Sequence, residues 1–321
     1  MAQLRRYHPV DSTVVPRVCG MRTFMRLPHV KTTEDVDFAV VGIPCDVGST
    51  FRTGSRFGPA AIREMSMLLR AGNAHLGVNI FEHVSGVDYG DINVNPCSIE
   101  DAHRAIEEGL QPIVDAGVIP VCLGGDHSIT LPELRAVAKK YGPVALVHFD
   151  AHLDTSDVQH GSRLTHGTPF ARAVEEGLID ATRSIQLGIR GIFSIESIKK
   201  SEDLGFEVIT ARQMRKMGLG AVAKRVKERV GDLPAFLTFD VDFLDPAYAP
   251  GTGTIEVGGF TSYEALDLLG ELWEMHFVGC DVVEVLPALD PTQITAYVAG
   301  NIAHQFISML ALRRKGERGE T

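Results

Sequence analysis

Residues 143–154 read PVALVHFDAHLD and join a short apolar run to a cluster of polar side chains. The apolar run is typical of a strand that is buried on both faces of a parallel sheet. Asp150, His152 and Asp154 follow it, and side chains two residues apart in an extended segment share one face. Sites in open α/β sheets lie at the carboxyl ends of strands. Because three titratable groups are costly to bury together without a cation, this stretch predicts a metal site.

Apolar runs and helical patterns alternate along the rest of the chain. Strands are predicted at 36–44, 86–95, 118–123, 143–149, 184–188, around Val208, at 235–239 and at 277–285. Helices are predicted at 60–70, 98–116, 131–140, 166–177, 220–230, 261–275 and 292–313. This βαβα alternation predicts a three-layer α/β/α fold around a central, mostly parallel sheet.

The chain divides into an arm, one domain and a tail. Residues 1–35 are irregular and rich in proline, which predicts a surface arm that packs on a neighbouring subunit. No repeat or shift in composition divides residues 36–313, so a single catalytic domain is the simplest interpretation. Residues 314–321 form a charged tail, predicted to be disordered from residue 315.

Composition excludes several classes of protein. The 321 residues are 45% hydrophobic and 22% charged, which is enough for a large core. The net charge of -10, without a long run of one sign, argues against nucleic acid or an anionic membrane as a partner. The five cysteines form no CxxC pair and indicate neither disulfides nor a thiolate zinc site. The sequence has no apolar signal region and no 18-residue apolar run, so a reducing cytoplasm is predicted.

Two further predicted strands end in side chains of the same chemistry as the opening stretch. The run 118–123 leads into GGDHS, which carries His127, and the run 235–239 leads into DVDFLDP, which carries Asp240 and Asp242. Parallel strands end at one edge of their sheet, so four carboxylates and two imidazoles are expected to meet there.

This ligand set indicates the metal and its chemistry. Carboxylates and imidazoles without thiolate fit Mn²⁺ better than structural zinc, and they are also compatible with Ni²⁺, Co²⁺, Zn²⁺ and Fe²⁺. Six ligands, several of them able to bridge, predict two ions about 3.5–4 Å apart. Such a pair generates a hydroxide at neutral pH, which is hydrolase chemistry.

The chain resembles the ureohydrolase family, which comprises arginases, agmatinases and related guanidino-compound hydrolases of the arginase/deacetylase-like fold. The motifs that carry the resemblance are GGDHS at 124–128, FDAHLD at 149–154, FDVDFLDP at 239–246, APGTGT at 249–254 and GCDVVEV at 279–285. In this order they are specific to the family. The segments HGTPF (166–170) and RAVEEGLID (172–180) resemble agmatinases and bacterial guanidino-acid hydrolases more than arginases.

The resemblance implies a role for each matching residue. A centre of two Mn²⁺ ions would be held by His127, Asp150, His152, Asp154, Asp240 and Asp242. The resemblance assigns His127 to one ion and His152 to the other, with Asp150 and Asp240 bridging. Asp154 would also orient the hydroxide that attacks the guanidinium carbon, and the products would be urea and a primary amine.

Two more residues match catalytic positions of the family. An amine leaves poorly unless it is protonated, and His166 matches the histidine that carries this proton. Glu284 matches the carboxylate that binds the guanidinium through charge-assisted hydrogen bonds. Asp126 and Ser128 are predicted to orient the ligands from behind. His148 lies inside the 143–149 strand and is predicted to be a packed core residue.

The best single prediction of the reaction is hydrolysis of agmatine to putrescine. The alternatives are a guanidino acid, such as 4-guanidinobutyrate or 3-guanidinopropionate, and guanidine or a biguanide. Asp157 could meet a distal ammonium, whereas Arg163, Arg52 or His160 could meet a distal carboxylate. His160 stands where many agmatinase-like sequences carry another residue, which leaves the substrate open.

Two other classes of protein are disfavoured. A catalytically silent ureohydrolase-like subunit is disfavoured because all six ligands, His166 and Glu284 are intact. A deacetylase of similar architecture is disfavoured by Glu284 and by the paired DxHxD and DxDxxDP patterns. Members of the family are commonly trimers or hexamers, so the resemblance implies a homotrimer or homohexamer that acts on a small guanidino compound.

Overall fold

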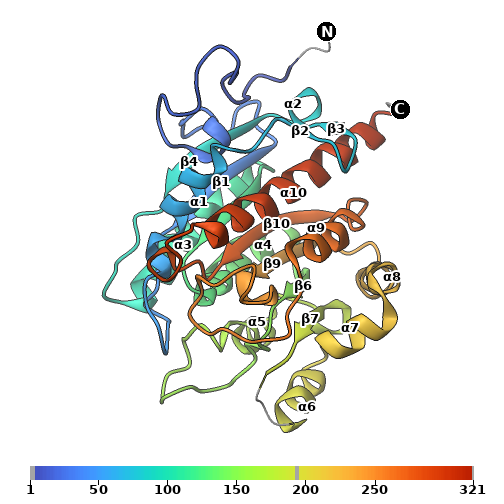
Figure 1. The fold of residues 1–321 in the computed structure, drawn as a ribbon. Helices are drawn as coiled ribbons and strands as arrows, with labels where there is room; N and C mark the ends of the chain where they lie inside the picture. Colours follow the sequence, from blue (N-terminus) through green and yellow to red (C-terminus); the bar gives the residue numbers. More distant parts are fainter. Residues whose placement is uncertain (1–3, 192–194, 320–321) are drawn as a thin grey trace.

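A parallel sheet forms the middle layer of the computed structural model, which describes residues 4–191 and 195–319 (Figure 1). Within these residues the main sheet has eight strands in the order β4-β1-β5-β10-β9-β6-β7-β8. The strands are β1 (Phe38–Ile43), β4 (Gly86–Asp91), β5 (Ile119–Gly124), β6 (Ala145–Phe149), β7 (Ile185–Ile189), β8 (Glu207–Thr210), β9 (Ala235–Asp240) and β10 (Phe277–Val283). Every neighbouring pair is parallel, so all of these strands end at the same edge.

Helices cover both faces of the sheet, which confirms the predicted three-layer fold (Figure 1). One face carries α1 (Gly58–Ser66), α2 (Ile80–His83), α7 (Ala211–Met217), α8 (Leu219–Val230), α9 (Ser262–Gly270) and α10 (Ile294–Glu317). The other face carries α3 (Ile99–Asp115), α4 (Thr130–Tyr141), α5 (Pro169–Glu175) and α6 (Ile195–Asp203). Strand side chains alternate between the layers, as Val40 and Val41 do.

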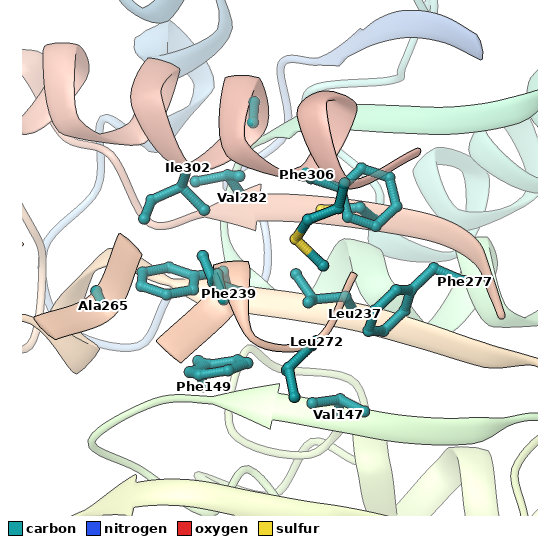
Figure 2. Packing of buried hydrophobic residues seen from close by; sticks show 14 of the residues in the cluster. Val147, Phe149, Leu237, Phe239, Ala265, Leu272, Phe277, Val282, Ile302 and Phe306 are labelled. Carbon is teal, nitrogen blue, oxygen red and sulfur yellow. The ribbon is translucent and has the colours of Figure 1, made fainter. Parts of the chain in front are cut away.

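The core beneath α10 is built from strand residues of one parity. Figure 2 shows Phe149 of β6 beside Phe239 of β9, and their rings stack with centroids 5.4 Å apart. Ile302 and Phe306 of α10 lie above Val282 of β10 in the same view. Side chains of the opposite parity on these strands therefore face the α3–α6 layer.

Local signals explain where several helices begin. Ser98 caps α3 as predicted, and its hydroxyl accepts the Asp101 N–H at 3.2 Å. Thr261 and Glu264 form a capping box at the start of α9. Helices α2, α6 and α7 and the β2–β3 hairpin (Gly72–Asn73 and Val78–Asn79) were not predicted, because such short segments give little periodicity. Among the described residues, no helix is long and apolar enough to cross a membrane.

The two ends of the chain lie at the same end of the molecule (Figure 1). The arm is mostly irregular and includes the short helix η1 (Phe24–Arg26), whose first N–H donates to Asp88 of β4 at 2.7 Å. Helix α10 continues to Glu317, past the predicted end at Arg313, because Arg313 pairs with Glu317 at 3.0 Å. The predicted disorder is therefore wrong for 315–317, while residues 320 and 321 lie outside the described residues.

Candidate metal centre

The order of the strands explains why distant motifs meet. β5, β10, β9 and β6 are neighbours in the sheet, and the chain leaves each of them at the same edge. β5 leads to His127, β10 to Glu284, β9 to Asp242 and β6 to Asp150. Short 3-10 turns, η3 (His127–Ile129) and η5 (Val241–Phe243), then aim His127 and Asp242 back over the sheet edge.

One group of ligands surrounds His127, which is fully buried. Its Nδ1 lies 3.0 Å from Asp154 Oδ2, 3.1 Å from Asp150 Oδ2 and 3.5 Å from Asp240 Oδ2. None of these oxygens is in hydrogen-bonding geometry, so Nδ1 is a buried polar atom without a partner among the described residues. Three carboxylates aimed at an unpartnered imidazole nitrogen fit a bound cation.

A second group surrounds His152. Its Nδ1 lies 2.9 Å from Asp242 Oδ2 and 3.4 Å from Asp150 Oδ1. Asp242 Oδ2 is also buried and lacks a hydrogen-bond partner in the described chain. Asp150 thus turns one carboxylate oxygen toward each group, which is the arrangement of a ligand shared by two ions.

His148 also reaches this centre. The ligand atoms of His127, His148 and Asp150 lie within 4.8 Å of one another. His148 is fully buried, as predicted, but it is not simply packed in the core, because its Nε2 lies 2.8 Å from Asp150 Oδ2. The ring of Phe170 from α5 packs on both imidazoles, with centroids 5.2 Å from His127 and 4.5 Å from His148.

Electrostatics also favour a cation here. Burial and the charges of Asp242 and Asp150 raise the pKa of Asp240 well above its usual range, and burial and Asp150 raise the pKa of Asp242 to about 7. Burial lowers the pKa of His127, but the carboxylates of Asp150, Asp154 and Asp240, which lie 3.0–3.5 Å from its Nδ1, outweigh burial and raise that pKa. The metal-free site thus retains protons where divalent ions would otherwise balance the carboxylates.

His166 and Glu284 form a pair beside the first ligand group. Glu284 Oε1 accepts the His127 backbone N–H at 3.0 Å and lies 3.0 Å from His166 Nδ1. Thr50 lies beside the other ring nitrogen of His166: its backbone nitrogen is 3.3 Å and its hydroxyl oxygen 2.7 Å from Nε2. Burial lowers the pKa of His166, but the hydrogen bond and charge of Glu284 prevail and raise it to about 9.

An open cavity of about 260 Å³ lies over these residues. Its lining includes Thr50, His152, Asp154, Ser156, Gln159, His166, Ser197, Asp240 and Thr254. Gln159 was missed by sequence analysis, since a glutamine in a polar loop carries no distinctive signal. It accepts a hydrogen bond from Thr165 at 2.7 Å, and it packs against Gly167, where an added Cβ would lie 2.2 Å from its amide nitrogen.

The three tentative substrate-loop residues lie away from this lining. Asp157 pairs with Arg172 at 2.6 Å, and Arg163 pairs with Glu175 at 2.6 Å, so both belong to a network of ion pairs on the surface. His160 is exposed at a turn with φ of 50°. None of these three side chains is among the described residues that line the cavity.

Asp126 and Ser128 hold a loop rather than the ligand side chains. Asp126 Oδ2 accepts the Gly48 N–H at 2.7 Å, and Oδ1 accepts the Ser128 N–H at 2.9 Å. Burial and the charge of Glu284 raise the pKa of Asp126 to about 6. The loop that follows β1 is thereby fixed so that Thr50 reaches His166.

Comparison with known proteins agrees with this geometry. The model of the Arginase family matches residues 36–308. The chain belongs to the arginase family. Among curated relatives, the mitochondrial agmatinase of Gallus gallus is 44% identical, over 94% of this chain and 89% of its own length. A guanidinobutyrase of Pseudomonas aeruginosa is 40% identical, over 95% of this chain and 97% of its own.

Solved structures of the arginase family extend the match to the fold. The proclavaminate amidino hydrolase of Streptomyces clavuligerus superposes with a TM-score of 0.89 at 39% identity, covering 93% of this chain and 99% of that one. The parallel sheet and its carboxyl edge are therefore shared with an arginase-family enzyme across nearly the whole chain.

Proposed function

We propose that the chain hydrolyses a guanidino compound to urea and a primary amine at a binuclear metal centre. The observation that carries this proposal is the position of Asp150, which turns one oxygen toward His127 and the other toward His152. Each of the two groups also contains a buried ligand atom without a hydrogen-bond partner among the described residues. Relatives that span nearly the whole chain are named agmatinase and guanidinobutyrase, which supports the same reaction.

The donor set suits two Mn²⁺ ions, since it consists of carboxylates and imidazoles without thiolate. The ions would be held by His127, Asp150, Asp154 and Asp240 on one side and by Asp150, His152 and Asp242 on the other. When bound, such ions lower the pKa of a water molecule so that it serves as the nucleophile at neutral pH.

The other site residues would bind the substrate and move a proton. Glu284 would accept N–H groups of the guanidinium, whose positive charge strengthens those hydrogen bonds. His166 holds a proton on Nδ1, next to Glu284, and its pKa of about 9 keeps it protonated at neutral pH. That proton would go to the nitrogen of the departing amine.

Charged side chains close in sequence to lining residues of the cavity could meet the distal group of the substrate: Asp157 follows Ser156, and Arg52 lies two residues after Thr50. Asp157, the residue offered for a distal ammonium, is already paired with Arg172. Arg52 has no ion-pair partner among the described residues and stacks on Phe51, with its guanidinium carbon 5.1 Å from the ring centroid. This distribution of charge favours a second candidate, a guanidino acid such as 4-guanidinobutyrate or 3-guanidinopropionate, beside the leading candidate agmatine.

Urea release from a panel of substrates tests the proposal. We expect Mn²⁺-loaded protein to release urea from agmatine or from a guanidino acid, and less from arginine, guanidine or a biguanide. Asp150→Asn is the matched control, because it removes the shared charge while keeping the side-chain shape, and it should stay folded without turnover. Absence of urea from every compound with metal present would contradict the proposal.

A homotrimer or homohexamer in the cytoplasm completes the proposal. Exposed apolar side chains of the arm support contact with a neighbouring subunit, since Val14, Val18 and Met21 are 76%, 79% and 67% exposed. Sedimentation equilibrium would measure the number of subunits. The chicken relative carries the word mitochondrial in its name, so location is to be determined by fractionation.

A further inference from the structure

A row of polar side chains crosses the sheet one layer beneath the metal centre. Parallel register pairs Gln186 of β7 with His148 of β6, His148 with Thr238 of β9, Thr238 with Asp281 of β10, and Asp281 with Cys122 of β5. All five of these side chains are fully buried. We call these five residues the polar row. Figure 2 shows their strand neighbours Val147, Phe149, Leu237 and Phe239 packing on the α9–α10 side, so the row faces the opposite layer.

The row touches both groups of candidate ligands. Thr238 Oγ1 lies 2.8 Å from His127 Nε2, and Asp281 accepts the Thr130 hydroxyl at 2.7 Å. On the other side, His148 Nε2 lies 2.8 Å from Asp150 Oδ2, and His148 Nδ1 lies 3.0 Å from Gln186 Nε2. Nearly all buried polar groups in proteins make hydrogen bonds. The donor and the acceptor in each of these contacts can therefore be assigned.

The hydrogen bonds of Gln186 decide the state of His148. The Leu153 carbonyl can only accept, and it lies 2.6 Å from Gln186 Nε2, so this atom is the amide nitrogen. The hydrogen bond from the Ser201 hydroxyl to Gln186 Oε1, at 2.5 Å, is consistent with this assignment of the amide atoms. The second N–H of Gln186 then donates to His148 Nδ1, which must be unprotonated. His148 therefore carries its proton on Nε2, the nitrogen that faces Asp150.

We infer that His148 is a positioning residue that donates its Nε2 proton to Asp150, and that Gln186 sets the tautomer that makes this donation possible. The inference rests on the proposed function, in which Asp150 is the shared metal ligand. Asp150 Oδ1 accepts the His152 backbone N–H at 2.5 Å, so each carboxylate oxygen is held by one donor. The carboxylate cannot rotate, and each oxygen keeps a lone pair for an ion.

The same hydrogen bonds separate this role from that of a ligand. A histidine binds a metal through an unprotonated nitrogen. In His148 the only unprotonated nitrogen is Nδ1, which is taken by Gln186, while Nε2 carries a proton. Its closeness to His127 and Asp150 therefore reflects support of the ligand Asp150 rather than a seventh ligand.

Titration with Mn²⁺, followed by the electron paramagnetic resonance signal of the free ion, tests the inference without recourse to activity. Wild-type protein should bind two ions per chain and release urea, and a failure of either would count against the proposed function itself. His148→Phe should still bind two ions, but about 10–100-fold more weakly for the ion that depends on Asp150. Gln186→Met should weaken binding in the same direction.

A double variant shows whether the two residues act through one hydrogen bond. His148→Phe combined with Gln186→Met should bind Mn²⁺ no more weakly than His148→Phe alone, since Gln186 acts only through His148. The matched control is His103→Phe on α3, which replaces another buried imidazole whose two nitrogens have no hydrogen-bond partner among the described residues. His103→Phe should leave Mn²⁺ affinity unchanged. His148→Phe and Gln186→Met should both fold, as judged by cooperative unfolding.

Two results would overturn the inference while leaving the proposed function standing. A His148→Phe protein that binds two ions with wild-type affinity would show that Asp150 needs no donor at Oδ2. A His148→Phe protein that saturates at one ion per chain would show that His148 is a ligand. The expected reduction in affinity at unchanged stoichiometry supports positioning.

Discussion

Glu284 adopts a backbone conformation that residues other than glycine rarely take, with φ of 63°. This conformation ends β10 and turns the side chain across the sheet edge, where Oε1 meets both His127 N–H and His166. Strain of this kind persists only where the surroundings over-determine it, and it is concentrated at functional sites. The conformation of Glu284 thus agrees with a role in binding substrate rather than in packing.

The pair of His166 and Glu284 gives a prediction about pH. Its contribution to stability is fully present below the ordinary histidine pKa of 6.5 and is lost as pH rises through about 9, because folding raises the pKa of His166. In metal-free Glu284→Gln protein the hydrogen bond and charge of Glu284 are lost, while burial and the charges of Asp154 and Asp126 remain, so the pKa of His166 should fall below its value of about 9. Nuclear magnetic resonance titration of the imidazole would measure this change, with His166→Gln to assign the signal. An unchanged pKa in Glu284→Gln would contradict the pairing.

Single residues differ in how far the sequence reveals them. Asp150, His152 and Asp154 stand out because three polar groups end an apolar strand. Thr238 and His148 also interrupt apolar runs, and that interruption was the available signal for their contacts with ligands. Thr50 and Gln159 carry no such signal, since each lies in a loop without a distinctive pattern and only the folded structure brings them to the cavity that His166 lines.

Arg190, just after β7, joins three segments around the ligand turn. Its guanidinium donates to the carbonyls of Asp242 at 2.5 Å, Glu256 at 2.9 Å and Gly188 at 3.3 Å. A planar group with five donors satisfies such a set of carbonyls, which a lysine with three donors on one nitrogen cannot do. Arg190 therefore holds the η5 turn, which carries Asp242, against the loop that follows it.

Arg190→Lys should reduce the free energy of unfolding of the metal-free protein by about 2–4 kcal/mol, because several buried carbonyls lose a charged donor. It should also weaken Mn²⁺ binding, since Asp242 is no longer held. Urea denaturation and Mn²⁺ titration measure the two effects. The matched control is Arg104→Lys, an exposed partner of Asp101, which should change stability by no more than about 0.5 kcal/mol. Equal losses in the two variants would refute the role of Arg190.

Strands and long helices follow from the sequence, but their register does not. Apolar runs predicted β6 and β9 because both faces of a parallel sheet are buried. Nothing in either run states that His148 and Thr238 lie opposite each other, since parallel strands are joined by distant crossovers. The metal ligands were nevertheless predictable, because residues at strand ends meet at one edge whatever the register. The polar row was not predictable, because it exists only through register.

At the scale of the whole molecule, one sheet edge collects a cluster of buried acidic side chains, which includes Asp150, Asp240, Asp242 and Glu284. Four carboxylates and two imidazoles come from the ends of β5, β6 and β9, which lie within a run of four neighbouring strands that also includes β10. The metal-free protein must keep some of these carboxylates protonated, as the raised pKa of Asp242, about 7, indicates. Bound ions would balance the charge of these carboxylates. They would also link β5, β6 and β9 through the ligands that follow these strands.

Removal of metal should therefore lower the melting temperature, and more so at higher pH. Ions that bind only the folded state at 1,000 times their dissociation constant stabilise it by about 4 kcal/mol, which amounts to several degrees for a large domain. Raised carboxylate pKa values stabilise the metal-free fold at low pH, and that contribution is lost as pH rises through about 7. Metal binding has the opposite dependence, because its ligands must be deprotonated. Calorimetry of Mn²⁺-loaded and chelated protein should thus show a gap in melting temperature that widens from about pH 6 to about pH 8, and a constant or narrowing gap would contradict the assignment of these residues as ligands.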